Sequence, residues 1–301
     1  MTKAGGRNAK YDFERLVERF NPLADQALKR FAWANTTAPK KLVDSMNYSL
    51  WAGGKRLRPM LVLAGCEAVG GKLKDAMPAA AAFEMIHTYS LIHDDLPAMD
   101  DDDLRRGKPT NHKAFDEGTA ILAGDAMLTY AFEVLSTHVK DATRANALVR
   151  ELSRGAGMEG MAGGQLLDLE AEGARPNIDT LRGIHQRKTG ALITSAVVCG
   201  GICGGAKAAT LKKLRAFGEK IGLAFQVIDD ILDMTATAAE LGKSPGKDKA
   251  ANKMTYPAVM GLIGAKKHAE ELVAAAVKQV AGLKAPAALQ TIAGYFIART
   301  H

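Results

Sequence analysis

The chain has 301 residues, of which 47% are hydrophobic and 24% are charged, a balance that indicates a globular protein. Its net charge of +7 comes without a Lys/Arg tract or an aromatic platform, which argues against nucleic acid as a partner and favours small anionic ligands. Three cysteines are too few for a disulfide scaffold, so a reducing, cytoplasmic location is expected.

Apolar residues recur with a helical period along almost the whole chain. The expected helices span 10–31, 40–69, 75–95, 117–138, 143–171, 178–203, 207–234, 255–279 and 284–299. Alternating strand patterns are nearly absent. We therefore predict an all-α fold with one large domain over residues 9–301, preceded by a mobile tail of residues 1–8. The most apolar stretch, 191–206, is short and interrupted by glycine, which predicts a buried helix and no stable membrane insertion.

A basic patch lies within the second expected helix. It reads Gly53-Gly54-Lys55-Arg56-Leu57-Arg58-Pro59. Lys55 and Arg58 could be ordinary surface charge, but the two glycines before them would let the backbone approach a phosphate closely. Both residues are therefore candidate anion ligands.

An apolar helix runs into an acidic cluster at residues 94–103. Pro97 should end this helix, because the residue before a proline avoids the α region. Asp94 and Asp95 then lie at a helix C-terminus, where the dipole disfavours negative charge, and residues 100–103 add further repulsion. Such a cluster requires cations, and oxygen ligands without a nearby cysteine indicate magnesium. A solvated acidic loop is the alternative, and the apolar helix before the cluster disfavours it.

Basic residues flank this first acidic cluster. Arg105 and Arg106 follow it directly, and arginines beside metal-bound carboxylates commonly hold phosphates. His87 precedes Asp94 by seven positions, about 20° away on the helical wheel, and so shares its face. A histidine on an apolar helix is more often a core residue, and His93 is interpreted in that way.

A second acidic cluster lies on one face of the helix expected over 207–234. At about 100° per residue, its members fall within one arc of about 100°. They are Gln226, Asp229, Asp230 and Asp233. Three unpaired acids would be costly to bury in an apolar helix, so this face is expected to bind cations unless solvent covers it.

These motifs together resemble the trans-isoprenyl diphosphate synthase family over most of the chain. The resemblance rests on the basic patch, Asp94-Asp95-Leu-Pro-Ala-Met-Asp100, Arg105-Arg106-Gly107 and Asp229-Asp230-Ile-Leu-Asp233. Further signatures follow in the family's order: Gly164-Gln165-Leu-Leu-Asp168, Lys188-Thr189-Gly190 and Lys253-Met-Thr-Tyr-Pro257. The resemblance implies an all-α domain around a central cavity, a homodimer, and condensation of an allylic diphosphate with isopentenyl diphosphate.

The resemblance also implies a role for each residue. Magnesium, three ions with substrate bound, or manganese would be held by Asp94, Asp95 and Asp100 and by Asp229, Asp230 and Asp233. The allylic diphosphate would contact Arg105, Lys188, Lys243 and Lys253, and isopentenyl diphosphate would contact Lys55, Arg58, His87 and Arg106. Thr189 and Gln226 would direct dipoles at the carbocation, so that Lys188, Thr189, Gln226 and Arg105 form the catalytic set.

Residues just before the first acidic cluster set the product length in this family. Tyr89 and Ser90 precede Asp94 by five and four positions, about 6–8 Å down the helix. A large Tyr89 side chain would close the cavity early. Together with the insertion Pro97-Ala98, it resembles the farnesyl-forming bacterial branch and implies a C15 product. The helical wheel itself places Ser90 nearer the Asp94 face, and plant-like geranylgeranyl synthases keep a C20 product open.

Other classes fit the motifs less well. Terpene cyclases usually carry Asn, Ser or Thr, and Glu in the second cluster, where this chain has three aspartates. Squalene-type synthases use different spacings and have no equivalent of the basic patch. A non-catalytic synthase subunit would have degraded clusters, and both clusters here are intact.

Overall fold

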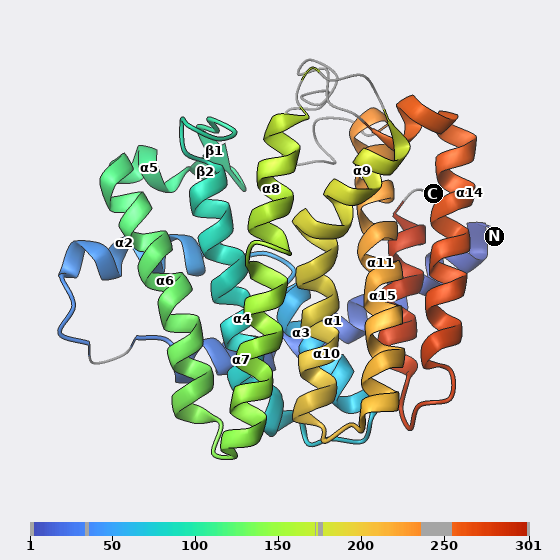
Figure 1. The fold of residues 1–301 in the computed structure, drawn as a ribbon, viewed down its shortest axis with the longest axis horizontal. Coiled ribbons are helices and arrows are strands. Elements are labelled where there is room, and N and C mark those ends of the chain that lie inside the picture. Colours follow the sequence, from blue (N-terminus) through green and yellow to red (C-terminus); the bar gives the residue numbers. More distant parts are fainter. Residues whose placement is uncertain (1–2, 34–35, 172, 174–176, 236–254, 300–301) are drawn as a thin grey trace.

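The computed structural model describes residues 3–33, 36–171, 173, 177–235 and 255–299. Nearly all of its elements are helices, and most of the long ones lie side by side, with α1 running across them (Figure 1). The elements in chain order are α1 (Lys3–Phe31), α2 (Lys40–Leu50), α3 (Leu57–Ala68), α4 (Leu73–Asp94), β1 (Leu104–Arg105), β2 (Lys108–Pro109), α5 (Asn111–Ala114), α6 (Glu117–His138), α7 (Ala142–Ala156), α8 (Met161–Glu170), α9 (Ile178–His185), the π-helical turn η1 (Gln186–Gly190), α10 (Ala191–Cys203), α11 (Ala208–Thr235), α14 (Tyr256–Val280) and α15 (Ala287–Ala298).

The all-α fold predicted from the helical period is confirmed. Helix α6 has the predicted bounds, and α4 ends at Asp94, before Pro97, as expected. Three expected helices are each divided. The segment expected over 40–69 breaks at Gly53 and Gly54, whose φ values of 88° and 123° are incompatible with a helix. The segments expected over 143–171 and 178–203 are divided by an extended turn and by η1.

A short β-hairpin follows the first acidic cluster, and the sequence does not predict it. Strands β1 and β2 pair antiparallel, with Arg105 opposite Lys108. The two residues between them, Arg106 and Gly107, have φ values of 54° and 75°. Positive φ at both positions is the mark of the tight turn that matches the twist of a hairpin. The turn directs the neighbouring side chains of Arg105 and Arg106 to different partners.

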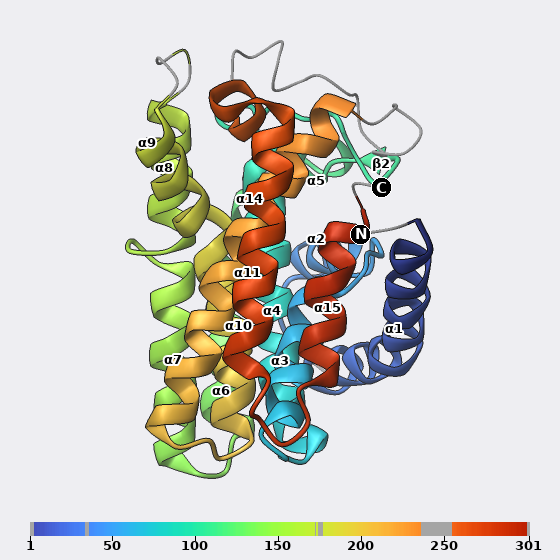
Figure 2. The same cartoon turned by 90° about the vertical axis from the view of Figure 1, so that its right-hand side faces the viewer.

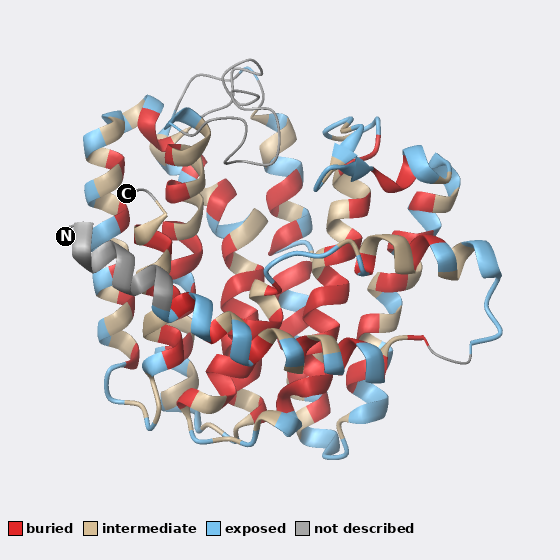
Figure 3. Ribbon diagram, turned by 180° about the vertical axis from the view of Figure 1, so that it is seen from behind, coloured by how far each residue is buried: buried red, intermediate tan, exposed pale blue. Residues whose placement is uncertain are grey.

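Helix α10 lies in the centre of the molecule. Residues 192–201 are all buried, as expected of a helix that is apolar on every side (Figure 3). It packs against α3, α7 and α11. A Cβ at Gly65 of α3 would lie 2.5 Å from the Val197 carbonyl oxygen, so this close crossing requires glycine. The prediction of a buried helix here is confirmed, and no helix of the described segments is long and apolar enough to span a membrane.

The fold places both acidic clusters at one end of the bundle. Helices α4 and α11 run in the same direction and finish at the end where the hairpin lies (Figure 1). Helix α1 covers one side, against α15, α3 and α4 (Figure 2). It begins at Lys3. The expected mobility of residues 1–8 stays a prediction.

Candidate active site

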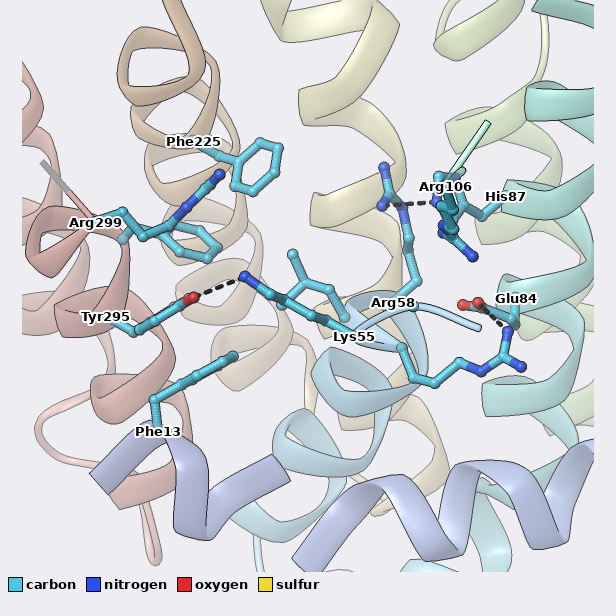
Figure 4. Close-up of a pocket in the computed structure, with 13 residues that line it drawn as sticks. Phe13, Lys55, Arg58, Glu84, His87, Arg106, Phe225, Tyr295 and Arg299 are labelled. Atoms are coloured by element: carbon cyan, nitrogen blue, oxygen red, sulfur yellow. Dashed lines mark hydrogen bonds and ion pairs between the residues drawn. The ribbon is translucent and has the colours of Figure 1, made fainter. Parts of the chain in front are cut away.

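A basic pocket of about 290 Å³ opens among α1, α4, α11, α15 and the loop before α3 (Figure 4). It brings together the four residues expected to contact isopentenyl diphosphate, which are Lys55, Arg58, His87 and Arg106. The other lining side chains labelled in Figure 4 are Phe13, Glu84, Phe225, Tyr295 and Arg299. Residues from both ends of the chain therefore complete a pocket that the sequence motifs indicate only in part.

His87 contributes a neutral imidazole to this pocket. Its Nε2 lies 3.2 Å from Nη1 of Arg58. Burial lowers the pKa of His87 well below its usual value, and the guanidinium groups of Arg58 and Arg106 lower it further. Because an uncharged Nε2 can accept a hydrogen bond, His87 holds the Arg58 side chain in place. The positive charge of the pocket thus comes from lysine and arginine.

The loop before α3 is held from two sides. On one side, Arg106 donates a hydrogen bond to the Gly53 carbonyl oxygen and lies so close that a Cβ at Gly54 would be 2.8 Å from its guanidinium. On the other side, Arg56 adopts a left-handed backbone with φ 49° and donates to the Glu84 carboxylate at 2.7 Å. Both side chains of that ion pair are buried. Gly54 thus permits a close approach, although to an arginine side chain of the same protein.

The first acidic cluster contains carboxylates that pair with a basic side chain and carboxylates that do not. Asp95 is 2% exposed and accepts hydrogen bonds from Nε of Arg105 at 2.7 and 2.9 Å. Asp94 receives no hydrogen bond from another side chain of the described residues, and burial raises its pKa to about 6. Asp100, at the exposed edge, donates its backbone N–H to the Asp94 carbonyl oxygen at 2.9 Å. Asp94 and Asp100 are therefore carboxylates of this cluster that no basic side chain of the described residues pairs with, and both are available to a cation.

Lys188 lies near the first acidic cluster, although it belongs to a different part of the chain. It lies in the π-helical turn η1, and π-helical turns inside α-helices are frequent at functional sites. Its Nζ lies 2.6 Å from Oδ2 of Asp168, and its charge lowers the pKa of Asp94 against the effect of burial. The approach of α8 to η1 needs Gly164, because a Cβ there would lie 2.1 Å from the backbone nitrogen of Lys188. Thr189, the next residue of η1, is half-buried.

The second acidic cluster forms one half-buried face of α11, with Gln226, Asp229, Asp230 and Asp233 all intermediate in exposure. Arg299 donates to Asp229 at 3.0 Å, and its guanidinium lies 5.5 Å from the centre of the Phe225 ring. The backbone N–H of Tyr256 donates to Asp230 at 2.9 Å. Neither contact is predictable from the acidic motif, because both come from helices far along the chain.

Oxygen ligands in both clusters suit a hard divalent cation such as Mg²⁺. The raised pKa of Asp94 supports this fit, because a buried carboxylate with few compensating partners is stabilised by a neighbouring cation. Within the described segments, no three His, Cys, Asp or Glu side chains are already grouped tightly enough to hold a metal. Two expected allylic ligands, Lys243 and Lys253, lie outside the described residues.

Tyr89 and Ser90 lie on α4, below the first cluster. Tyr89 is 8% exposed, and its ring meets the His93 ring edge-on at 5.8 Å between centroids. Burial and the charge of Asp94 raise the pKa of Tyr89 to about 12, so the phenol stays neutral. Ser90 donates to the His87 carbonyl oxygen at 2.9 Å. His93, interpreted from the sequence as structural, packs against Gly124 and contacts the Ile121 carbonyl oxygen at 3.1 Å.

Comparisons with known proteins identify the family of the chain. Residues 39–291 match the family model described as polyprenyl synthetase. A chloroplastic geranylgeranyl pyrophosphate synthase of Capsicum annuum is 52% identical, over 85% of this chain and 70% of its own. The farnesyl diphosphate synthase of Bacillus subtilis (strain 168) is 49% identical, over 81% of this chain and 84% of its own. The crystal structure of an FPP/GFPP synthase from Zymomonas mobilis, 36% identical, superposes with a TM-score of 0.82 and covers 96% of this chain and 99% of its own.

Proposed function

Because the chain belongs to the polyprenyl synthetase family, we propose that this prenyltransferase condenses dimethylallyl or geranyl diphosphate with isopentenyl diphosphate and forms mainly farnesyl diphosphate. The observation that supports this most is the convergence of Lys55, Arg58, His87 and Arg106 on one pocket. Three permanent cations and a neutral hydrogen-bonding imidazole suit a diphosphate group.

The reaction breaks the C–O bond between the allylic group and its diphosphate. We assign Arg105 and Lys188 to the departing diphosphate, and their proximity to the Asp94 carboxylate, whose pKa both charges lower, supports this assignment. Fixed positive charge aimed at the leaving oxygens stabilises the charge that develops there. The double bond of isopentenyl diphosphate then attacks the allylic carbon, and a proton leaves the new chain. We expect the released diphosphate to accept this proton.

The organic cation needs a different environment from the diphosphate. An apolar wall without water protects it from quenching, and a few oriented dipoles stabilise it. The hydroxyl of Thr189 and the amide of Gln226 are our candidates for these dipoles. Both side chains are half-buried beside the residues expected to bind diphosphate.

Bound Mg²⁺ would neutralise the diphosphate and favour its departure. Asp94 and Asp100 would hold it on the α4 side, with Asp95 assisting, because Arg105 already occupies the Asp95 carboxylate. On the α11 side, Asp229 would be the main ligand, with Asp230 and Asp233. Mn²⁺ has the same preference for oxygen ligands and would serve in its place.

The product length tests the finer part of this proposal. Relatives of similar identity are named for farnesyl and for geranylgeranyl products, so C20 is the competing outcome. The purified protein should be incubated with Mg²⁺, geranyl diphosphate and isopentenyl diphosphate, and the dephosphorylated alcohols separated by chromatography. We expect mostly the C15 alcohol. Mostly C20 alcohol would overturn the farnesyl assignment and leave prenyl transfer in place.

Tyr89→Ala should lengthen the product. The Tyr89 side chain is buried on α4, five residues before Asp94, where a growing chain directed away from the diphosphates would meet it. Removing the ring leaves space for at least one further C5 unit. We expect products of C20 or longer to become the main species, measured by the same chromatography. An unchanged product length would remove Tyr89 from this role.

A homodimer is also proposed. Helix α6 presents the apolar side chains of Ile121 and Leu122 to solvent, 44% and 61% exposed. Large contiguous apolar patches mark association surfaces, and we propose that these two neighbours belong to the surface that the partner chain covers. Light scattering should report the mass of two 32.0 kDa chains, and a monomer mass would contradict this proposal.

A further inference from the structure

Three segments far apart in the chain meet at the Lys55 side chain. The Lys55 Nζ donates a hydrogen bond to the Tyr295 hydroxyl at 2.8 Å and lies 5.3 Å from the centre of the Tyr295 ring. Phe13 of α1 stacks on that ring, with centroids 3.7 Å apart and planes 4° from parallel. Figure 4 shows Phe13, Tyr295 and Lys55 one next to the other along the pocket wall.

Phe13 restricts Tyr295, and Tyr295 restricts Lys55. The Phe13 ring is 3% exposed, so it is fixed within the core between α1 and α15. A ring stacked flat on it has little freedom to turn. The Tyr295 hydroxyl is therefore presented at a constant position, even though Tyr295 itself is only half-buried.

Lys55 needs such a partner more than the other basic residues of the pocket do. Arg58 is placed by His87, and Arg106 is placed by the Gly53 carbonyl oxygen. Lys55 has four flexible side-chain bonds and follows two glycines with positive φ. Among the described residues, the polar partner of the Lys55 ammonium is the Tyr295 hydroxyl. An ammonium group has three donors, so the contact leaves two for a diphosphate.

We propose that Tyr295, supported by Phe13, is a positioning residue that fixes the Lys55 ammonium for the diphosphate of the isopentenyl substrate. The inference rests on the proposed function. Neither Tyr295 nor Phe13 belongs to the motifs that indicate the reaction. Through them the first and last described helices act on substrate binding.

Tyr295→Phe tests the proposal, because it keeps the stacked ring and removes the hydroxyl. We expect the KM for isopentenyl diphosphate to rise about 3–10-fold, the range of one lost hydrogen bond, with kcat and the KM for geranyl diphosphate within about twofold of wild type. Phe13→Leu should raise the same KM by a smaller factor. Tyr130→Phe, on α6 away from the pocket, is the matched control and should change neither constant.

A Lys55→Met background separates positioning from a general structural role. There, adding Tyr295→Phe should change the KM for isopentenyl diphosphate by less than about twofold, because the positioned group is gone. Equal effects of Tyr295→Phe with and without Lys55 would overturn the inference, and so would an unchanged KM in the single variant. If wild-type protein does not elongate geranyl diphosphate at all, the proposed function itself fails, which is a distinct result.

Discussion

Asp94→Asn should lower kcat/KM by about 10²–10³-fold, the effect of removing one fixed charge at the centre of a reaction. Asp94 has three properties that no other carboxylate of its cluster combines. It is partly buried, its pKa is raised to about 6, and no side chain of the described residues donates a hydrogen bond to it. Lys188 and Arg105 act on Asp94 only through their charge, so a bound divalent cation would supply the direct partner that its carboxylate lacks. Asparagine keeps the shape and removes the charge.

Steady-state kinetics at saturating Mg²⁺ measure this effect, and circular dichroism checks that the variant is folded. Asp103→Asn is the matched control in the same loop. Asp103 is 76% exposed at its side chain and pairs with Lys113 at 2.9 Å, away from the pocket. We expect its activity to stay within about twofold of wild type. Equal losses in both variants would mean that the loop as a whole matters, and that Asp94 has no special role.

Arg56→Met should lower the free energy of unfolding by about 3–5 kcal/mol, because it leaves the buried Glu84 carboxylate without its partner. Arg56 Nη1 donates to Glu84 at 2.7 Å and Nη2 donates to the Leu50 carbonyl oxygen at 2.9 Å. The side chains of the pair are only 6% and 3% exposed. Methionine keeps the length of the side chain, so the main loss is the charge pair.

Urea unfolding followed by circular dichroism measures the change. Arg19→Met removes an exposed ion pair with Glu67, whose side chains are 50% and 23% exposed, and should cost no more than about 1 kcal/mol. The double variant Arg56→Met/Glu84→Leu should recover most of the stability, because no buried charge is then left unpaired. A single-variant loss below about 1 kcal/mol would show that Arg58 and Arg106 already stabilise the Glu84 carboxylate.

The helices were predictable because their signal is local. A 3.6-residue apolar period and the position of Pro97 are sufficient to locate α4, α6, α11 and α14. The hairpin was not predictable, because strands of two residues are too short to show an alternating pattern. The breaks in the expected helices depend on glycine torsions, and the π-helical turn η1 has no local sequence signal that we can identify.

The site was predictable where charge stands out against apolar helices. Asp94 and Asp229 were found in this way, and so were the basic residues beside two glycines. Tyr295 was not found, because its partner Lys55 lies 240 positions earlier in the chain. Glu84 was not found either, because a single acid within an apolar helix carries no sign of the arginine that it pairs with. Such contacts depend on how the helices pack together, which the periodicity of one helix does not specify.

The central claim is that the chain joins an allylic diphosphate to isopentenyl diphosphate with the help of a divalent cation. The most direct measurement uses protein freed of metal by a chelator, geranyl diphosphate and radiolabelled isopentenyl diphosphate, with and without added Mg²⁺. The claim predicts a labelled, elongated product only when Mg²⁺ is present, and diphosphate release only when isopentenyl diphosphate is also present. Diphosphate release at an equal rate without isopentenyl diphosphate, or no labelled product with Mg²⁺, would contradict it.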